Sequence, residues 1–580
     1  MLLTRRAART LFLVLCWLVS IQASAQDGGA PLAIVPVGLD AGAVSPPAAI
    51  EVTVRDKSKL ERTRESSDAV TVVDLSAASR QASDVGEVLA RTEGINVRRL
   101  GGLGSDARFT LNGLSDDQIR FFVDDVPIEL AGYVQGFANL PWLLLDQVVV
   151  YRGVVPIRFG ADALGGAVNL ITHQPTRGWG GEASYQVGSF GTHRATLSAF
   201  QVHQPTGIYG RVSLYLDSSR NDYRVDDVDV SDANGQVQTR SADAFHNGYR
   251  AFGGSLEVGV VKRPWAERLA LRVFGMKLER ELQTNLIQSA SYGEARFDRA
   301  SVGSTLRYQQ RLARALRLEA LAGYSFVPTH FTDDSRWVYN WLGQRVAPDP
   351  TPGETTSRPV EQTFWQHNSF ARVELSWKLA SGHDLMLAVM PTHVLRSGRD
   401  ELRREGRDPL ADQQQQLSIV SGLAYRLNVL DDLLENTLFA KSYVYRAQAN
   451  QRAPNGTPID RDRNVARFGV GDSVRVRITQ SLYTKASYEL ATRLPRPDEV
   501  FGDGVLVNSN LTLKEETSHN GNLELTLRHQ TERIGELRGS VNGFLRKIHN
   551  QIVLIGVARD ARYQNVYGAR SRGVETSAGW

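Results

Sequence analysis

Apolar and polar residues alternate along many segments of the chain from about Gly180 onward. In Phe370–Leu379, for example, Val373 and Leu375 fall on one face, and Arg372 and Glu374 fall on the other. The same alternation occurs in Ile208–Asp217, Leu316–Phe326 and Phe468–Thr479. A period of two predicts β-strands with one apolar and one polar face. It fits a membrane barrel with lipid outside, and it equally fits a soluble sandwich with an apolar interior.

The connections between these strands separate the two alternatives, because they tend to alternate between brief and extended. The brief connections are Gln204–Gly207, Lys262–Ala266, Ala313–Ala315, Ser381–Asp384, Leu430–Asp432 and Thr479–Ser481. The extended connections are Asn221–His246, Gln283–Glu294, Thr332–Glu361, Ser397–Gln413, Asn450–Asp462 and Thr492–Glu516. Outer-membrane barrels have short periplasmic turns and long external loops. The sequence therefore predicts a membrane all-β fold, a transmembrane antiparallel β-barrel.

A different pattern, rich in glycine, occupies Asp84–Thr172. One helical piece, Asp84–Arg91, begins this stretch, with Ser83 or Asp84 as its expected N-cap. Short apolar pieces then lie between turn residues, as in a small α+β domain. These pieces are Ile95–Val97, Phe109–Leu111, Phe121–Val123, Val148–Tyr151 and Val168–Ile171.

The residues of this stretch form a series of short motifs in a fixed order. They are Glu93-Gly94-Ile95-Asn96-Val97, Arg99-Leu100-Gly101-Gly102, Leu111-Asn112-Gly113-Leu114, Asp124-Asp125-Val126-Pro127, Tyr151-Arg152-Gly153 and Phe159–Asn169. In this order the stretch resembles the plug domain of TonB-dependent outer-membrane receptors. Two positions depart from that family, which usually has Arg-Gly at Asn112-Gly113 and Asp-Gly at Asp124-Asp125. Arg493–Gly502, Asn510–Glu516, Asn565–Gly568 and Ser571–Glu575 also resemble barrel segments of the family.

The resemblance implies an N-terminal α+β plug domain, residues 66–175, in the lumen of a barrel formed by residues 180–580. Residues 26–65 then form a flexible leader. Within it, Ile50, Glu51, Val52, Thr53 and Val54 resemble a TonB box, which the energy-coupling protein TonB binds by strand addition. The alternative is that these residues form one more strand of the plug.

The resemblance also implies active transport of a scarce ligand across the bacterial outer membrane, most simply a ferric siderophore or a similar metal chelate. Cobalamin, a nickel chelate and an oligosaccharide remain alternatives, as does a passive porin or adhesin barrel. The expected partners are TonB, outer-membrane lipid and a small-molecule ligand. A net charge of +4 over 580 residues gives no support to a nucleic-acid partner.

The first 25 residues have the pattern of a cleaved signal peptide. Arg5, Arg6 and Arg9 precede an apolar core from Leu11 to Ile21 and the small-residue site Ala23-Ser24-Ala25. The apolar core is shorter than the roughly 20 residues of a spanning helix. The only cysteine, Cys16, lies within this segment, so the mature chain is expected to contain no thiol.

The barrel has about 16 strands by this pattern, fewer than the plugged class of about 22. Sixteen strands enclose a backbone radius of roughly 16 Å. A plug of this size has a radius of about 17 to 18 Å. We therefore expect the chain to lack the last five or six strands; the alternative is a natural end at Trp580.

No catalytic motif is found, and the histidines are scattered, so we expect no enzyme, no cofactor and no metal site. By resemblance, ligand contacts come from plug apices and external loops. The candidates are Arg98, Arg99, Ser115, Asp117, Tyr133 and Gln135, with Trp337, Tyr339 and Trp341 in a long loop, where they pack on a ligand or on the loop itself. Arginines at the apices favour an anionic ligand. The resemblance further implies that Arg152 of the plug and Glu516 of the barrel form a latch between the two domains.

Overall fold

The computed structural model of the chain describes most residues from Thr63 onward. The described residues are 63–75, 85–134, 136–141, 144–160, 162–174, 177–231, 236–285, 288, 290–349, 352–355, 358–403, 408–452, 458–502, 507–531, 533, 535–556 and 561–580. The expected TonB box, Ile50–Val54, lies outside them, as do the expected helix caps Ser83 and Asp84 and the candidate ligand residue Gln135.

The first part of the described chain is the α+β domain that the short apolar pieces predict. Its main sheet has the order β1-β7-β8-β5-β6, in which β5 and β8 are parallel and the other pairs are antiparallel. A second sheet contains β2, β3 and β4. The elements are β1 (Val70–Asp74), α4 (Val85–Ala90), β2 (Ile95–Arg99), β3 (Ala107–Leu111), β4 (Leu114–Ser115), η1 (Asp116–Gln118), β5 (Arg120–Val123), β6 (Val126–Pro127), η2 (Phe137–Asn139), β7 (Leu145–Arg152), η4 (Ile157–Phe159) and β8 (Gly166–Thr172).

The core of this N-terminal domain consists of buried apolar side chains, as in a soluble protein. Leu89 of α4 packs in one buried cluster with Val148 of β7 and Val168 of β8. Phe109, Phe121 and Phe137 pack ring against ring, with centroids 4.4 to 5.6 Å apart. Aromatic contacts of this kind add to the stabilisation from burial alone.

Both departures from the family pattern fall in two-residue hairpin turns with left-handed backbone. Asp124 and Asp125, with φ of 50° and 65°, connect β5 to β6. Such turns favour glycine, because side chains rarely adopt positive φ. Here the side chains form compensating hydrogen bonds: Asp124 accepts from the Thr172 hydroxyl at 2.6 Å, and Asp125 accepts from the Asn169 amide at 2.8 Å. Asn112, with φ of 51°, tolerates the equivalent turn between β3 and β4 because asparagine visits this region more readily than most residues.

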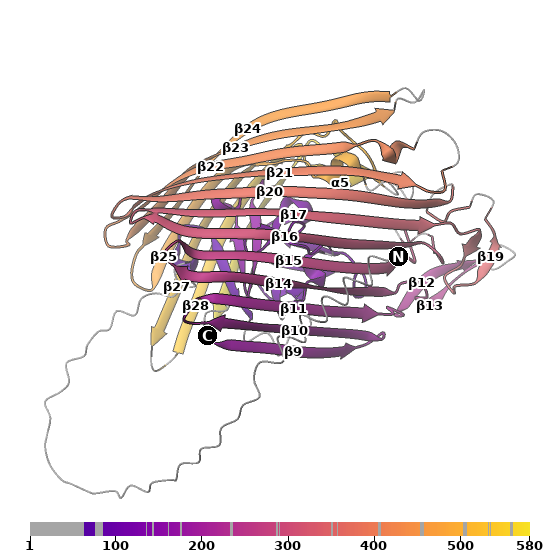
Figure 1. The fold of residues 1–580 in the computed structure, drawn as a ribbon, viewed down its shortest axis with the longest axis horizontal. Helices are drawn as coiled ribbons and strands as arrows, with labels where there is room; N and C mark the ends of the chain where they lie inside the picture. The colour runs from indigo at the N-terminus through magenta and orange to yellow at the C-terminus, as the bar shows by residue number, and fades with distance from the viewer. Residues whose placement is uncertain are drawn as a thin grey trace, which may run out of the picture. The chain divides into compact units, whose positions relative to one another are not determined.

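The rest of the chain forms a 16-stranded antiparallel sheet, in agreement with the strand count from the sequence (Figure 1). Apart from hairpins within connections, each strand pairs with the next along the chain. The strands are β9 (Trp179–Gly188), β10 (Thr192–His203), β11 (Ile208–Ser219), β14 (Tyr249–Arg263), β15 (Ala266–Glu281), β16 (Arg296–Ala313), β17 (Leu316–Asp333), β20 (Val360–Ala380), β21 (His383–Asp400), β22 (Gln414–Val429), β23 (Leu434–Arg452), β24 (Pro458–Arg477), β25 (Leu482–Arg493), β27 (Glu516–Thr531), β28 (Gly535–His549) and β31 (Gly568–Gly579). β9 and β31 are the outermost strands in this order, and no pairing joins them in the part of the chain that is described.

In this sheet the apolar face is exposed and the polar face is buried, which is the reverse of a soluble sandwich. On β24, Phe468 and Val470 are 76% and 51% exposed, whereas Ser473 and Arg475 are almost fully buried. On β20, Val373 is exposed and Arg372 is buried. The apolar side chains therefore point away from the N-terminal domain and the polar ones point toward it. This is the arrangement of a membrane barrel, and it excludes the soluble sandwich.

The alternation of brief and extended connections is confirmed, and it gives the sheet two different ends. At the short-turn end, β22 and β23 are joined by residues 430–433 and β24 and β25 by residues 478–481. The long connections carry extra elements: β12 (Arg224–Ser231), β13 (Val237–Asp243), β18 (Trp337–Tyr339), β19 (Arg345–Pro348), η5 (Pro409–Ala411), α5 (Pro497–Phe501), β26 (Val507–Asn508), β29 (Ile552–Ile555) and β30 (Ala561–Asn565). Among the described residues, no helix combines the length and the apolar character needed to cross a membrane.

Candidate ligand cavity and the contacts of the N-terminal domain

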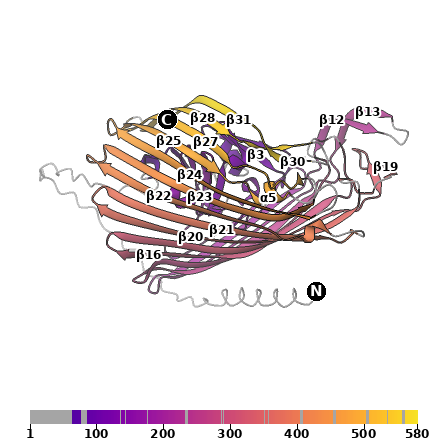
Figure 2. The same ribbon diagram turned by 90° about the horizontal axis from the view of Figure 1, so that it is seen from above.

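The N-terminal domain lies inside the curve of the 16-stranded sheet (Figure 2). Buried polar side chains from many strands of the sheet bind it. Contacts come from β11 near one edge of the sheet, where Arg211 donates to the Thr172 hydroxyl at 2.8 Å. They extend to β31 at the other edge, where Glu575 pairs with Arg152. Buried charges need partners, because burial removes them from water. The domain supplies some of those partners, and neighbouring strands supply others, as for Arg194 with Asp217 and Arg493 with Glu516.

Arg152, at the end of β7, is the centre of the most highly charged of these contacts. Its side chain is nearly fully buried and lies 3.5 Å from each of three carboxylates: Glu93 of its own domain, Glu524 of β27 and Glu575 of β31. Asn112 faces the same group, and its amide donates to Glu575 at 3.2 Å in the orientation that satisfies both side chains. We call Arg152, Asn112, Glu524 and Glu575 the latch cluster.

The expected pairing of Arg152 with Glu516 is not formed. Glu516 instead binds Arg493 on the neighbouring strand β25 and accepts the backbone N–H of Ile552 at 2.6 Å. The side chain of Glu516 lies at the long-connection end of β27, whereas Glu524 is eight residues farther along the same inward face. The expected partner Glu516 was therefore wrong, and Glu524 of the same strand lies beside Arg152 instead.

A second contact binds a single residue of the domain through its backbone. Lys441 of β23 donates to the Val155 carbonyl at 2.7 Å, and Glu489 of β25 accepts the Val155 N–H at 3.2 Å. Lys441 and Glu489 also pair with each other at 2.6 Å, and both are buried. Each member of the ion pair therefore also binds one backbone group of Val155, and these two hydrogen bonds fix the position of the loop that contains Val155.

The strained turn at Asp124-Asp125 is held by two arginines of the sheet. Arg307 of β16 donates to the Asp124 carbonyl, and Arg372 of β20 donates to the Asp125 carbonyl at 2.8 Å. Both arginines also lie near Glu319 of β17, at 3.7 and 2.8 Å. Backbone carbonyls exposed by the tight turn are therefore recognised by charged donors, which form stronger hydrogen bonds than neutral ones.

Residues 64–68, which lead into β1, contact the sheet at its short-turn end. Arg475 donates to the Glu65 carbonyl at 2.8 Å, and Arg477 pairs with the Glu65 carboxylate at 2.8 Å. Lys485 donates to the carbonyls of residues 64 and 68 at 2.9 and 2.8 Å. Ser67 completes the set, with its hydroxyl 3.0 Å from that of Thr437. We call residues 64–68 the anchor segment.

The anchor segment is one hydrogen bond away from the latch cluster. The Ala69 carbonyl, directly after the segment, accepts the backbone N–H of Arg152 at 2.8 Å. β1 then pairs with β7 from Val70 opposite Tyr151 to Asp74 opposite Gln147. The end of the anchor segment is therefore connected to Arg152 by a single backbone hydrogen bond.

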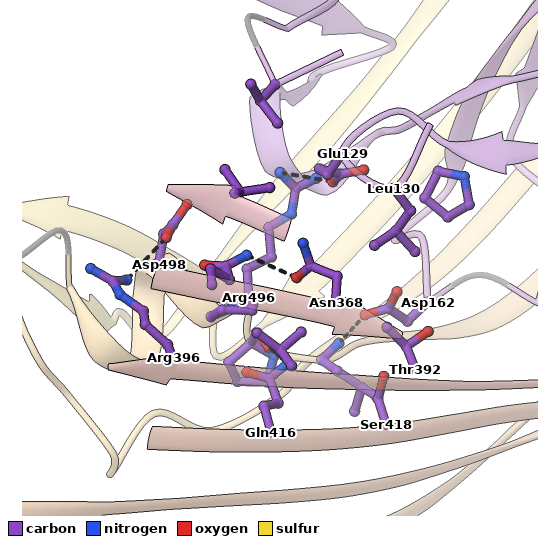
Figure 3. A pocket seen from close by; sticks show the side chains of 18 of the residues that line it. Glu129, Leu130, Asp162, Asn368, Thr392, Arg396, Gln416, Ser418, Arg496 and Asp498 are labelled. Atoms are coloured by element: carbon purple, nitrogen blue, oxygen red, sulfur yellow. Dashed lines mark hydrogen bonds and ion pairs between the residues drawn. The ribbon is translucent and has the colours of Figure 1, made fainter. Parts of the chain in front are cut away.

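At the opposite end of the sheet, a cavity of about 470 Å³ separates the N-terminal domain from the strands (Figure 3). The domain contributes Glu129, Leu130 and Asp162 to its lining, β20 to β22 contribute Asn368, Thr392, Arg396, Gln416 and Ser418, and the connection before α5 contributes Arg496. The strand residues lie near the long-connection ends of their strands. A volume of this order is typical of small-molecule sites.

Four arginines and three carboxylates line this cavity. Arg120 pairs with Asp162 at 2.7 Å, Arg396 pairs with Asp498 at 3.3 Å, and Arg496 lies 3.9 Å from Glu129. Arg299 of β16 is different, because it donates to the Thr329 hydroxyl at 3.2 Å and no carboxylate among the described residues forms an ion pair with it. The lining therefore carries one cation more than it carries anions.

Two of the ligand candidates from the sequence lie beside this cavity. Asp117 binds the lining residue Arg496. Burial raises the pKa of the Asp117 carboxyl, but the charges of Arg496, Arg493 and Arg120 outweigh burial and leave the pKa below its ordinary value. Tyr133 is buried next to the lining residue Val134, and its hydroxyl accepts from Arg272 at 3.2 Å.

The other described candidates lie elsewhere. Arg98, Arg99 and Ser115 do not line the cavity. Trp341 is buried against Val228 and Val230 of the β12–β13 hairpin. Trp337 and Tyr339 stack under the guanidinium of Arg345, at 5.4 and 5.9 Å. Trp337 and Tyr339 thus contact their own loop and Trp341 contacts a neighbouring one, and contact of these aromatics with a ligand stays a prediction.

Several residues of the site were not anticipated from the sequence, chiefly Arg299, Arg396, Lys441, Glu489 and Arg496. Most of them could have been recognised as interior residues, because they are charged and lie on the polar face of an alternating strand, where they must find partners inside the barrel. The sequence contains no signal for which partner each one takes, because those partners lie hundreds of residues away, as for Lys441 and Val155.

Comparison with known proteins agrees with this architecture. The sequence profile described as "TonB-dependent Receptor Plug Domain" matches residues 62–167, and that described as "TonB dependent receptor-like, beta-barrel" matches residues 263–580. The vitamin B12 transporter BtuB of Vibrio vulnificus (strain CMCP6) is 30% identical over 128 residues. That match spans 22% of this chain and only 21% of the length of BtuB.

Solved structures share the fold at low sequence identity. The copper transporter OprC superposes with a TM-score of 0.65 at 16% identity, over 88% of this chain and 76% of OprC. The siderophore receptor PirA from Acinetobacter baumannii gives 0.64 at 15% identity, over 90% and 79%. The ferric-catecholate import receptor Fiu from K12 E. coli gives 0.62 at 14% identity, over 89% and 78%.

The second profile alone covers more than half of the chain, and the first coincides with the domain that the polar face of the sheet binds. Members of this family are transport receptors built as outer-membrane β-barrels. The chain therefore belongs to the family of TonB-dependent receptors, with an N-terminal plug domain and a transmembrane β-barrel.

Proposed function

We propose that this receptor actively imports a scarce small-molecule ligand across the bacterial outer membrane, with TonB pulling on the leader. One observation carries the proposal: the cavity and the anchor segment lie at opposite ends of the barrel. Long connections of outer-membrane barrels are external and short turns are periplasmic. The cavity then faces the ligand, and the anchor segment faces the compartment that contains TonB.

The proposed ligand is an anionic metal chelate, of which a ferric siderophore is the first example. Arg299 offers a guanidinium that no described carboxylate neutralises, and three further arginines lie around the same space. Guanidinium groups bind carboxylate and catecholate oxygens in forked geometry. PirA and Fiu are named for siderophore and ferric-catecholate import, OprC for copper and BtuB for vitamin B12. Cobalamin and an oligosaccharide are therefore the alternative cargoes.

The proposed energy transfer runs through the polar contacts described above. A pull on the leader first breaks the hydrogen bonds of residues 64–68 with Arg475, Arg477 and Lys485. It then strains the bond between Ala69 and Arg152 and disturbs the latch cluster. Hydrogen bonds loaded one after another give way at lower force than bonds loaded together, so we propose that this order permits repeated opening.

We further propose residues 1–25 as a cleaved signal peptide, 26–65 as the leader with its TonB box, 66–175 as the plug and 180–580 as the barrel. A passive porin or adhesin is the rival function. The plug makes a passive function less suitable, because contacts from β11 to β31 bind the plug to the inner face of the barrel.

Deletion of the expected TonB box, residues 50–55, distinguishes active import from diffusion. We expect the deletion to abolish uptake of a radiolabelled substrate while binding at the cell surface stays unchanged, because no residue that lines the cavity is removed. Ferric catecholate, ferric hydroxamate and cobalamin are the substrates to test. Deletion of residues 38–43 removes the same length of leader and is expected to leave uptake intact. Uptake that survives the first deletion would establish passive entry instead.

Replacement of Arg152 by alanine is expected to loosen the plug. It leaves Glu93, Glu524 and Glu575 buried together without their cation, a loss of roughly 3–5 kcal/mol for breaking a buried pair. Cells should then admit large antibiotics, and the plug should become sensitive to protease. Combining R152A with E524Q should recover part of the loss, because one uncompensated charge is removed.

The matched control for this variant is Arg220→Ala, which removes an exposed arginine that pairs with Asp222. Surface pairs contribute little, so antibiotic exclusion should remain as in the unmodified receptor. Equal protease resistance of R152A and R220A would show that the latch cluster does not hold the plug.

A disulfide between residues 67 and 437 is expected to block transport without affecting ligand binding. The two hydroxyl oxygens are 3.0 Å apart, close enough for S67C and T437C to be bridged. The bridge prevents release of the anchor segment, so uptake should fall at least tenfold when oxidised and recover on reduction. The pair T192C/S219C joins β10 to β11 within the barrel and should have no effect. Undiminished uptake by the oxidised S67C/T437C variant would exclude release of this segment as a transport step.

A further inference from the structure

A group of basic side chains lies on the outward face of β27, β28 and β31. Lys547, Arg570, Arg572 and His519 are exposed, and His549 is half-buried. Nearer the short-turn end, the outward-facing positions of these strands are occupied by leucine and valine instead. We call these five residues the outer basic cluster.

The strand register brings the members of this cluster together. His519 is opposite Lys547 in the pairing of β27 with β28, and Lys547 is opposite Arg570 in the pairing of β28 with β31. Arg572 is opposite Leu545, two residues from Lys547. The rings of His519 and His549 are 6.3 Å apart. Opposite and diagonal positions of adjacent strands have side chains in contact range, so three strands present one continuous basic surface.

These cations differ from the arginines of the barrel interior. Within the described residues, Lys547, Arg570 and Arg572 form no ion pair, whereas inward arginines such as Arg372 and Arg493 pair with glutamates. The nearest glutamate on β31, Glu575, faces inward to Arg152. Three uncompensated like charges on adjacent strands repel one another, and an anionic partner would relieve that repulsion.

The position of the cluster along the strands matches the outer boundary of a membrane. Lys547 lies twelve residues after the start of β28 at Gly535, and His519 lies twelve residues before the end of β27 at Thr531. At about 2.6 Å of height per tilted residue, this is about 30 Å above the short turn, just beyond an apolar band of about 25 Å. Leu523, Leu525 and Leu545, all exposed, occupy the band directly below.

A partner for this surface needs phosphate groups at the height of the cations and acyl chains against the leucines below them. We propose that the outer basic cluster binds one phosphorylated glycolipid of the outer leaflet. The proposal rests on the outer-membrane location and does not depend on the ligand or on TonB. Lysine and arginine side chains bind phosphate strongly, and Tyr488, whose hydroxyl is 2.9 Å from His519, extends the polar surface at the same height.

Native mass spectrometry of the full chain in detergent tests this proposal. The probe is a hexa-acylated disaccharide lipid with two phosphates, and its dephosphorylated form and inorganic phosphate are the comparison arms. We expect one phosphorylated lipid per chain. The variant K547Q/R570Q/R572Q should bind it on the order of 100-fold more weakly, and K547Q alone about fivefold more weakly. The dephosphorylated lipid should bind the unmodified chain as weakly as the triple variant binds the intact lipid.

The matched control is K262Q/R314Q/K378Q, which removes the same charge from exposed residues near the short-turn end. It should bind the lipid as the unmodified chain does. Heat-dependent gel mobility confirms that each variant still forms the barrel. Equal lipid affinity of the two triple variants would overturn the proposal. So would full competition by inorganic phosphate at the lipid concentration, because that would indicate a site for the free anion.

Discussion

The structure depends on a reversal of the usual rule of burial. Along β20 and β24 the apolar side chains are exposed, and Arg372, Ser473 and Arg475 are buried. In water this arrangement would be unfavourable on both faces, since apolar surface would stay hydrated and charges would be desolvated. In a bilayer the apolar face is favourable, and only the inner face needs partners. A closed ladder of backbone hydrogen bonds is the other requirement that lipid imposes.

Some of the partners on the inner face come from the plug, and others come from neighbouring strands. Arg307 and Arg372 bind carbonyls of the strained turn at Asp124-Asp125, and Lys441 and Glu489 bind the peptide of Val155. Such contacts are specific in position, but each adds little net stability, because burying the charges costs nearly as much as the pairing returns. An apolar interface of the same size would hold the plug more firmly. The polar interface suits the proposed function, in which the plug is fixed at rest and displaced by a pull on the leader.

Much of the fold could be predicted from the sequence, because two periodicities encode it directly. Residues such as Arg372 and Val373 identify opposite faces of a strand, and the brief and extended connections identify the two ends of the barrel. The plug elements were found from short apolar pieces between glycines, and β2, β5, β7 and β8 begin and end within a few residues of those pieces. Each of these signals comes from residues close together in the sequence, so it can be recognised without knowledge of the three-dimensional arrangement.

The site could be predicted only in part, because its contacts join residues far apart in the chain. The barrel partners of Arg152 are Glu524 and Glu575 and not the expected Glu516, since the register of β27 decides which glutamate reaches the plug. Trp341 is chemically suited to a ligand, yet it packs on Val228 and Val230 of another loop. Asp124 and Asp125 depart from the glycine-containing turn of the family, and only the structure shows the side-chain hydrogen bonds that replace glycine's freedom.

The reversal of burial is tested most directly by spin labels placed one at a time at residues 468–476 of β24 in a receptor reconstituted in lipid vesicles. Collision with oxygen, which concentrates in lipid, and with a water-soluble nickel chelate would be measured at each position. Oxygen accessibility should peak at 468, 470, 472, 474 and 476 and fall at the positions between them, whereas nickel accessibility should stay low throughout. Peaks of nickel accessibility at the even positions would contradict the account, because they would place the apolar face in water.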